Sequence, residues 1–221
     1  MAHAPPGRMT RGVFVTGTDT GIGKTLVSAC LVARWQADYW KPAQTGVAED
    51  TPDTATVAQL ARMAAARIHP PRHVFQAPLS VQAAAALESA SVTLEDFHLP
   101  DTASPLVVEG AGGVLVPLAP GVLMADLMAR LGLPVLLVAR TSLGTINHTL
   151  LSLEALRARG LTVAGVVFSG PPNPGNRDAI AVHGRVRILH ELPALPVVSP
   201  ATIAQAAAAF VGFDGVFEGE V

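Results

Sequence analysis

Residues 16–25 read TGTDTGIGKT, which matches the pattern of a phosphate-binding loop. A short apolar run at 12–15 precedes them and predicts a strand, and apolar residues follow at helical spacing over 26–35. Glycines let backbone amides close around phosphate oxygens, and a helix N-terminus adds a partial positive charge. The Lys24 side chain would reach the outer phosphates, and the Thr25 hydroxyl would bind Mg²⁺. The stretch therefore predicts a nucleoside triphosphate site.

The loop departs from the strict pattern G-x-x-x-x-G-K-[ST] at one position. Thr18 stands where the pattern has glycine, and Gly17 lies one place early, but the closing GKT at 23–25 keeps its place. One alternative is a strand–turn–helix junction with incidental glycines. Another is a dinucleotide fingerprint, G-x-G-x-x-G, which fails because Leu26 replaces its last glycine. The phosphate loop is the better interpretation.

The composition is that of a compact globular chain. The 221 residues are 50% hydrophobic and 14% charged, with a formal net charge of −2 and no run of Lys and Arg. This composition excludes a disordered chain and argues against a nucleic-acid or membrane partner. The single Cys30 is interpreted as a small buried hydrophobe, and the longest apolar segment, 131–139, is too short to span a bilayer. We expect a soluble, cytoplasmic protein.

The organisation along the chain predicts one α/β domain at 11–221, preceded by a flexible tail at 1–10. Short apolar runs predict strands at 13–15, 37–40, 106–108, 135–138 and 163–168. Helical patterns lie at 26–35, 54–63, 83–86, 146–159 and 202–210, and the stretch PPNPG at 171–175 predicts a loop. Alternating strands and helices predict a doubly wound, mostly parallel sheet with helices on both faces. Ligands would bind at the carboxyl ends of its strands.

Three further polar residues follow apolar runs and are candidates for the same site. Glu109 ends one run and leads into a glycine-rich turn, where the backbone could approach a phosphate. Lys41 follows another strand and could neutralise charge that develops during phosphoryl transfer. Asp53 precedes a helical pattern, so on its own it is interpreted as a helix cap rather than as a metal ligand.

Four motifs in one order carry a resemblance to a known family. They are TGTDTGIGKT at 16–25, KPAQTG at 41–46, VEGAGG at 108–113 and LGTINH at 143–148. Together they resemble the dethiobiotin synthetases, ATP-dependent enzymes of biotin synthesis within the P-loop NTPase superfamily. The resemblance extends from about Val13 to the ELP segment at 191–193, which is most of the chain.

The resemblance implies a reaction, its partners and its site. CO₂ would add to an amine of 7,8-diaminononanoate, ATP would phosphorylate the carbamate, and the second amine would close the ring. It implies Lys41 and Lys24 as catalytic, and Thr25, Asp53 and Glu109 as Mg²⁺ ligands. It implies nucleotide contacts at Gly21, Ile22, Gly23, Lys24, Thr25, Leu26, Asp53, Glu109, Gly110, Ala111, Gly112, Ser169, Gly170, Pro193, Ala194 and Leu195. It implies substrate contacts at Thr18, Thr45, Gly144, Thr145, Ile146 and Asn147, the last four across a homodimer interface.

Two departures from the family and two other functions also bear on the interpretation. Ser169 stands where the family often has an adenine-reading asparagine, and Ala181 where some members have tyrosine. A regulatory ATPase of the partitioning or site-selection type would carry a signature lysine early in the loop, where this chain has Asp19. A synthetase that amidates cobalamin precursors would usually carry a glutaminase domain with a nucleophilic cysteine. His148 is interpreted as a structural histidine at a helix start.

Overall fold

The computed structural model describes residues 11–211; the tail expected at 1–10 lies outside this range. The strands are β1 (Gly12–Gly17), β2 (Asp38–Trp40), β3 (Ala43–Gln44), β4 (Ile68–His69), β5 (His73–Val74), β6 (Leu106–Gly113), β7 (Pro117–Ala119), β8 (Val122–Leu123), β9 (Val135–Arg140), β10 (Val163–Ser169) and β11 (Ile188–Leu192). The α-helices are α1 (Lys24–Trp35), α2 (Asp53–Leu60), α3 (Val81–Leu87), α4 (Met124–Leu131), α5 (Thr145–Arg157), α6 (Pro174–Gly184) and α7 (Pro200–Ala208). Short 3₁₀ turns lie at Ala65–Arg67 and Leu94–Asp96.

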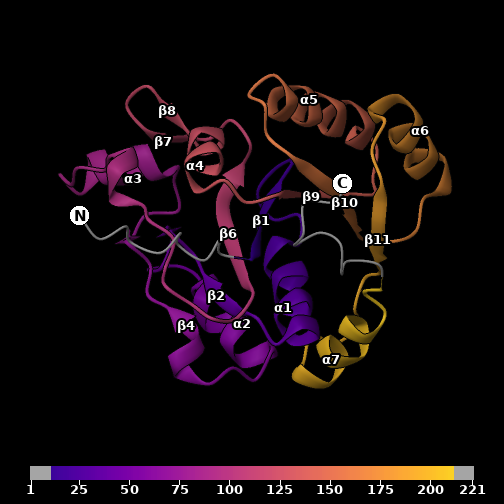
Figure 1. The fold of residues 1–221 in the computed structure, drawn as a ribbon, viewed down its shortest axis with the longest axis horizontal. Coiled ribbons are helices and arrows are strands. Elements are labelled where there is room, and N and C mark those ends of the chain that lie inside the picture. The colour runs from indigo at the N-terminus through magenta and orange to yellow at the C-terminus, as the bar shows by residue number, and fades with distance from the viewer. Residues whose placement is uncertain (1–10, 212–221) are drawn as a thin grey trace, which may run out of the picture.

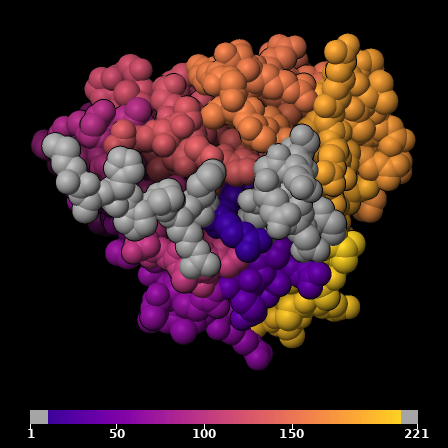
Figure 2. Space-filling view, viewed as in Figure 1, coloured from indigo at the N-terminus to yellow at the C-terminus, as the bar shows by residue number. Residues whose placement is uncertain are grey.

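The central sheet has seven strands in the order β11-β10-β9-β1-β6-β2-β4, and each neighbouring pair is parallel. Helices cover both faces of this sheet, which confirms the predicted doubly wound α/β fold (Figure 1). Strand β1 lies between β6 and β9, where the strand order reverses, and ligands of such sheets bind at that point. The indigo N-terminal segment accordingly lies between the magenta and orange parts of the chain in Figure 2.

The core forms two apolar layers because residues of each strand alternate between the two faces of the sheet. Phe14 of β1 packs in the layer beneath α3, α4, α5 and α6, together with Val108 and Leu137. Its neighbours Val13 and Val15 pack in the opposite layer, beneath α1, α2 and α7. Cys30 is fully buried in this second layer as a free thiol, as its interpretation as a small hydrophobe required. Burial raises the pKa of Cys30 to about 12.

The predicted elements are present, with boundaries moved by up to three residues except that β6 continues five residues beyond its predicted end, and the loop predicted at 171–175 is wrong for its last two residues. Pro174 and Gly175 lie in the first turn of α6 rather than in a loop. Asn173 caps this helix by accepting from the Asn176 amide at 3.1 Å, and proline suits a first helical position because it needs no amide donor there. The sequence interpretation also missed α4 and β11. Between residues 11 and 211, none of the helices has the length and apolar character needed to cross a bilayer.

Candidate functional site

The glycines of the loop between β1 and α1 have the backbone geometry that a phosphate cradle needs. Gly21 and Gly23 have φ values of 69° and 97°, in the left-handed region that favours glycine. Gly23 is the N-cap of α1 and makes no side-chain capping bond. A Cβ atom at Gly23 would lie 2.3 Å from the Ser169 Oγ atom, so the loop also packs too closely against β10 for any side chain there. The N-terminus of α1 therefore presents backbone amides without a covering side chain.

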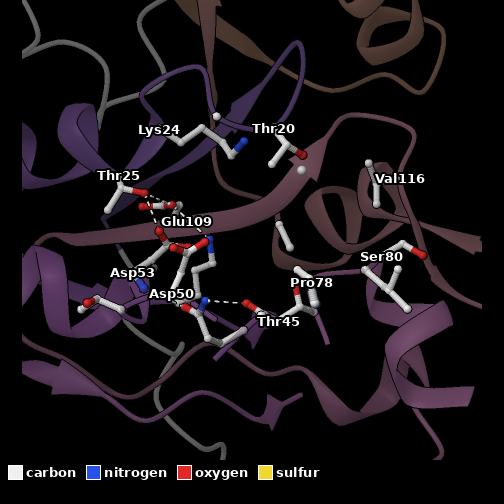
Figure 3. Close-up of a pocket in the computed structure, with 18 of the residues that line it drawn as sticks. Thr20, Lys24, Thr25, Thr45, Asp50, Asp53, Pro78, Ser80, Glu109 and Val116 are labelled. Atoms are coloured by element: carbon white, nitrogen blue, oxygen red, sulfur yellow. Dashed lines mark hydrogen bonds and ion pairs between the residues drawn. The ribbon is translucent and has the colours of Figure 1, made fainter. Parts of the chain in front are cut away.

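Lys24 is the first residue of α1 and is 7% exposed. Its Nζ atom donates to the carbonyl oxygen of Asp19 at 2.8 Å, and the side chain points toward Thr20 in Figure 3. Burial lowers the pKa of Lys24 to about 8; the neighbouring charge of Lys41 lowers it too, while Glu109 acts in the opposite direction. The Lys24 ammonium is thus held by a hydrogen bond within the loop that would bind the phosphates.

The three predicted Mg²⁺ ligands lie together. The Thr25 hydroxyl donates to Asp53 Oδ1 at 2.7 Å and to Glu109 Oε1 at 3.1 Å (Figure 3). Glu109 is fully buried, and the buried Tyr39 hydroxyl donates to its second oxygen at 3.0 Å. In residues 11–211 there is no group of three or more His, Cys, Asp or Glu side chains arranged for a metal. A metal here would depend on one hydroxyl and two carboxylates.

Lys41 joins the same cluster from the end of β2 and is 3% exposed. Its Nζ atom lies 2.6 Å from Asp53 Oδ2 and 3.1 Å from Glu109 Oε1, and it donates to the Gly110 carbonyl at 3.3 Å. Burial alone would lower the pKa of Lys41, but the charges of Glu109 and Asp53 outweigh it and raise the pKa. Lys41 therefore stays charged in the interior of the site.

The interpretation of Asp53 as a helix cap is wrong. The N-cap of α2 is Pro52, and Asp53 is the first helical residue, with its carboxylate directed at Thr25 and Lys41. Its own amide donates to Gln44 Oε1 at 3.2 Å. Burial would raise the pKa of Asp53, but the Lys41 charge and its hydrogen bond, together with the Thr25 hydroxyl, lower it below the ordinary value.

A cavity of about 610 Å³ opens above this cluster. Its lining includes the predicted residues Gly21, Gly23, Lys24, Thr25, Lys41, Thr45, Asp53, Glu109, Ala111 and Gly112. It also includes residues that the predicted site left out: Thr20, Gln44, Gly46, Asp50, Thr51, Pro78, Leu79, Ser80 and Val116. Some of these had a signal, because Thr20 belongs to the loop at 16–25, Gln44 and Gly46 belong to the KPAQTG motif, and Asp50 and Thr51 lie just before Asp53. Val116 had none, and neither had Tyr39, which bonds to Glu109 but does not line the cavity.

Other predicted residues lie outside this cavity. Ile22 is buried in the core and Leu26 packs against it, so these two contribute backbone rather than side chains to the loop. Ser169 ends β10 beside the loop, and Gly170 follows it. Residues 193–195 follow β11 next to them, where the Gly170 amide donates to the Leu192 carbonyl at 2.9 Å. Thr18 instead lines a second hollow of about 500 Å³.

The segment 144–147 begins α5 and does not line the cavity. Gly144 is the N-cap, with φ 92° and no side-chain cap, and Asn147 is exposed. Thr145 is fully buried, and its hydroxyl donates to the Arg140 carbonyl at 2.6 Å, so this side chain serves the fold. A ligand at this segment would meet backbone amides and the Asn147 side chain. The interpretation of His148 as a structural histidine finds no support in its burial, since the residue is exposed on α5.

Solved structures of low sequence identity share the fold. A ParA family ATPase from Chlorobium tepidum has a TM-score of 0.56 at 12% identity, and the match covers 95% of each chain. The MinC:MinD cell division complex from Aquifex aeolicus has a TM-score of 0.51 at 12% identity, covering 92% of this chain and 96% of that one. At such identity the likeness establishes the architecture alone.

Relatives of higher identity define the family. The model of an AAA domain family matches residues 11–202. The ATP-dependent dethiobiotin synthetase BioD of Paramagnetospirillum magneticum is 56% identical over 88% of this chain and 93% of its own length. The enzyme of that name from Brucella ovis is 48% identical, over 87% and 90%. The biotin biosynthesis bifunctional protein BioCD of Bordetella avium is 60% identical over 86% of this chain, which spans 41% of that longer protein. The chain belongs to the ATP-dependent dethiobiotin synthetase family.

Proposed function

We propose that this protein converts 7,8-diaminononanoate, CO₂ and ATP into dethiobiotin, ADP and phosphate. The observation that carries the proposal is the position of the Lys41 ammonium, 2.6 Å from Asp53 and 3.1 Å from Glu109, in the cavity that Lys24 also lines. Two buried lysines beside a phosphate loop suit a reaction that brings a carbamate and a triphosphate together, because both are anions. Membership of the family supports ATP and 7,8-diaminononanoate as substrates, and CO₂ is part of the proposal.

The chemistry divides into three steps that the site residues would serve. One amine attacks CO₂ and loses a proton, which gives a carbamate. A carbamate oxygen then attacks the γ-phosphorus of ATP, ADP leaves, and a mixed carbamic–phosphoric anhydride remains. The second amine attacks the carbonyl carbon and loses a proton, the carbon–oxygen bond to phosphate breaks, and the ureido ring closes. Lys24 and Lys41 would hold the carbamate oxygen and the γ-phosphate in line and neutralise their charges.

The donor set of Thr25, Asp53 and Glu109 fits Mg²⁺. It offers two carboxylates, each within hydrogen-bond distance of the one hydroxyl, and Mg²⁺ prefers hard oxygen ligands. When bound, Mg²⁺ would neutralise the β- and γ-phosphate oxygens of ATP. Asp53 and Glu109 would hold the ion, and Tyr39 would keep the Glu109 carboxylate in place through the oxygen that faces away from Thr25.

A second copy of the chain is part of the proposal. The α5 N-terminus offers the backbone amides of Gly144, Ile146 and Asn147, where a substrate carboxylate from the partner's cavity would bind, while the Thr145 amide donates to the Ser142 carbonyl. Exposed leucines lie beside it: Leu143 is 99% exposed, and Leu115 and Leu151 line one hollow at exposures of 49% and 55%. Burial of these leucines would stabilise a homodimer.

The test is mass spectrometry of a reaction that contains the protein, ATP, Mg²⁺, bicarbonate and 7,8-diaminononanoate. Dethiobiotin formed with one ADP per molecule supports the proposal. ADP formed at an equal rate without the diamine contradicts it and favours a regulatory ATPase, and absence of both products contradicts it as well. Replacement of ATP by GTP or CTP would then measure base preference, which Ser169 is expected to relax because one hydroxyl cannot make the two bonds of an amide.

A further inference from the structure

An ion pair joins the end of β9 to the phosphate loop. Arg140 is the last residue of β9, and its Nη2 atom lies 2.5 Å from Asp19 Oδ2. The two side chains are 35% and 54% exposed, and neither residue lines the cavity of about 610 Å³. Arg140 is therefore placed to influence the nucleotide through Asp19 rather than by contact.

Asp19 makes two hydrogen bonds within the loop, one through its side chain and one through its carbonyl oxygen. Its second carboxylate oxygen accepts from the Thr20 amide at 2.8 Å, and its carbonyl oxygen accepts from Lys24 Nζ at 2.8 Å. The bond to the Thr20 amide lowers the pKa of the Asp19 carboxyl, and the charges of Arg140 and His148 lower it further. Movement of Asp19 would consequently break the bond from the Thr20 amide and displace the carbonyl oxygen that accepts from Lys24.

The backbone of Arg140 is itself held firmly. Its carbonyl accepts from the Thr145 hydroxyl at 2.6 Å, and Thr145 is fully buried at the start of α5. The residue is also paired in the sheet with Ser169 of β10, whose side chain packs against Gly23. The guanidinium thus extends from a rigid strand end to the Asp19 side chain of the loop.

The Asp19 carboxylate has an electrostatic cost of its own. It is a negative charge on the loop that is predicted to receive a triphosphate, next to Thr20 of the cavity lining. Unpaired, it would repel the nucleotide; paired with Arg140, its charge is neutralised. Solvent screens part of this repulsion, so the effect depends on salt concentration.

We propose that Arg140 is a positioning residue for nucleotide binding: by pairing with Asp19 it fixes the phosphate loop that presents Lys24 and removes a repulsive charge. This inference rests on the proposed function only in taking ATP as the nucleotide. Nucleotide binding is measured without the diamine, so its outcome is independent of dethiobiotin formation.

The experiment is calorimetric titration of ATP with Mg²⁺ into the wild type and three variants, Arg140→Gln, Asp19→Asn and the double variant. Arg140→Gln should raise the dissociation constant about tenfold at about 0.02 M salt and by less at about 0.3 M salt. Asp19→Asn should bind within about twofold of the wild type, because the amide oxygen can still accept from the Thr20 amide and the repulsive charge is removed, although the amide nitrogen cannot accept from Arg140. In the Asp19→Asn background, Arg140→Gln should change binding by less than about threefold.

Two further variants separate positioning from general destabilisation. Arg140→Lys keeps the charge and should recover most of the affinity. Arg177→Gln breaks a comparable surface ion pair, with Glu191 at 3.2 Å, and should leave ATP binding unchanged. Arg140→Gln binding equal to that of the wild type would overturn the proposal. An equal loss in the presence and absence of the Asp19 charge would also overturn it, since Arg140 would then act independently of Asp19.

Discussion

At the scale of the residue, Lys24 and Lys41 lie in one cavity, yet their pKa values shift in opposite directions. Burial lowers the pKa of Lys24 to about 8, and its nearest partner is a neutral carbonyl. Lys41 is buried more deeply, but two carboxylates at 2.6 and 3.1 Å more than offset its desolvation. Lys41 is thus a permanent cation in the site, whereas the charge of Lys24 depends more on what binds there.

Lys41→Met should lower kcat about 10²–10³-fold, because it removes a preorganised charge and keeps the chain length. Affinity for ATP should stay within about threefold, since Lys24 and the loop backbone remain. Rapid-quench measurement of ADP formation, with calorimetry for ATP, separates the two effects, and thermal unfolding checks that the variant folds. Turnover close to that of the wild type would remove Lys41 from the catalytic residues.

Glu109→Gln should raise the Mg²⁺ concentration for half-maximal activity about tenfold or more, because a neutral amide binds a hard cation more weakly. The Tyr39 hydroxyl can still donate to the amide oxygen, so the fold should tolerate the change. A Mg²⁺ titration of initial rates measures it. Glu49→Gln, an exposed change in the loop before α2, is the matched control. Coincident titration curves for wild type and Glu109→Gln would exclude Glu109 from the metal site.

At the scale of the element, the contact between the α1 N-terminus and β10 limits what the loop can contain. Gly23→Ala should weaken ATP binding at least about tenfold, because its φ of 97° is strained for alanine and the new Cβ would lie 2.3 Å from Ser169 Oγ. Adding Ser169→Gly should recover part of the loss. Gly21→Ala, at φ 69° with no atom within 4 Å of its Cβ, carries strain alone and should gain nothing from Ser169→Gly. If Ser169→Gly changes ATP binding equally in the Gly23→Ala and Gly21→Ala variants, the contact between residue 23 and Ser169 does not limit binding.

The opposite end of β2 is held by a polar cluster around Asp38, whose side chain is 10% exposed. Asp38 Oδ1 accepts from Arg67 at 2.9 Å, and Oδ2 accepts from the Thr102 hydroxyl at 2.6 Å. Burial would raise the pKa of Asp38, but these hydrogen bonds and the one with His69 lower it. The cluster joins β2, β4 and the segment before β6, so it supports the edge of the sheet from which Lys41 extends.

Asp38→Asn should lower the free energy of unfolding by about 1–3 kcal/mol at pH 7, as expected for the loss of charged hydrogen bonds. The folded pKa of Asp38 lies below its unfolded value near 4, so this stabilisation is complete above about pH 4 and is lost as the pH falls through the folded pKa. Urea unfolding from pH 3 to pH 7 should therefore show wild type and variant converging in acid. The exposed Asp101→Asn is the control. A pH-independent difference would contradict the assignment.

At the scale of the whole molecule, the cavity and the α5 N-terminus lie apart, so the proposed dimer makes a prediction. Mixed Lys41→Met and Asn147→Ala chains should regain activity, because a heterodimer rebuilds one site from two intact halves. Random exchange of equal amounts makes half of all dimers heterodimers. Each heterodimer has one working site of two, so about a quarter of wild-type activity is expected. Native mass spectrometry monitors exchange. Complete exchange without recovery would show that each site belongs to one chain.

Local patterns predicted the parallel α/β fold, the loop at 16–25 and the carboxylate of Glu109, because glycine spacing and apolar runs reflect short-range geometry. They failed at α6, where prolines and an asparagine looked like a loop but start a helix. They also favoured a helix cap over a metal ligand for Asp53, since its partners Thr25 and Lys41 lie 28 and 12 positions away in the chain.

The sequence alone established the fold class, the phosphate loop and the family of this protein, because strands, helices and each of the four motifs depend on residues close together in the chain. Long-range packing alone settled which side chains meet. It placed Tyr39 on Glu109, Ser169 on Gly23 and Arg140 on Asp19, pairs that are separated by 70, 146 and 121 residues. Such contacts arise when parallel strands deliver their carboxyl ends to one edge of the sheet, and no local pattern encodes that arrangement.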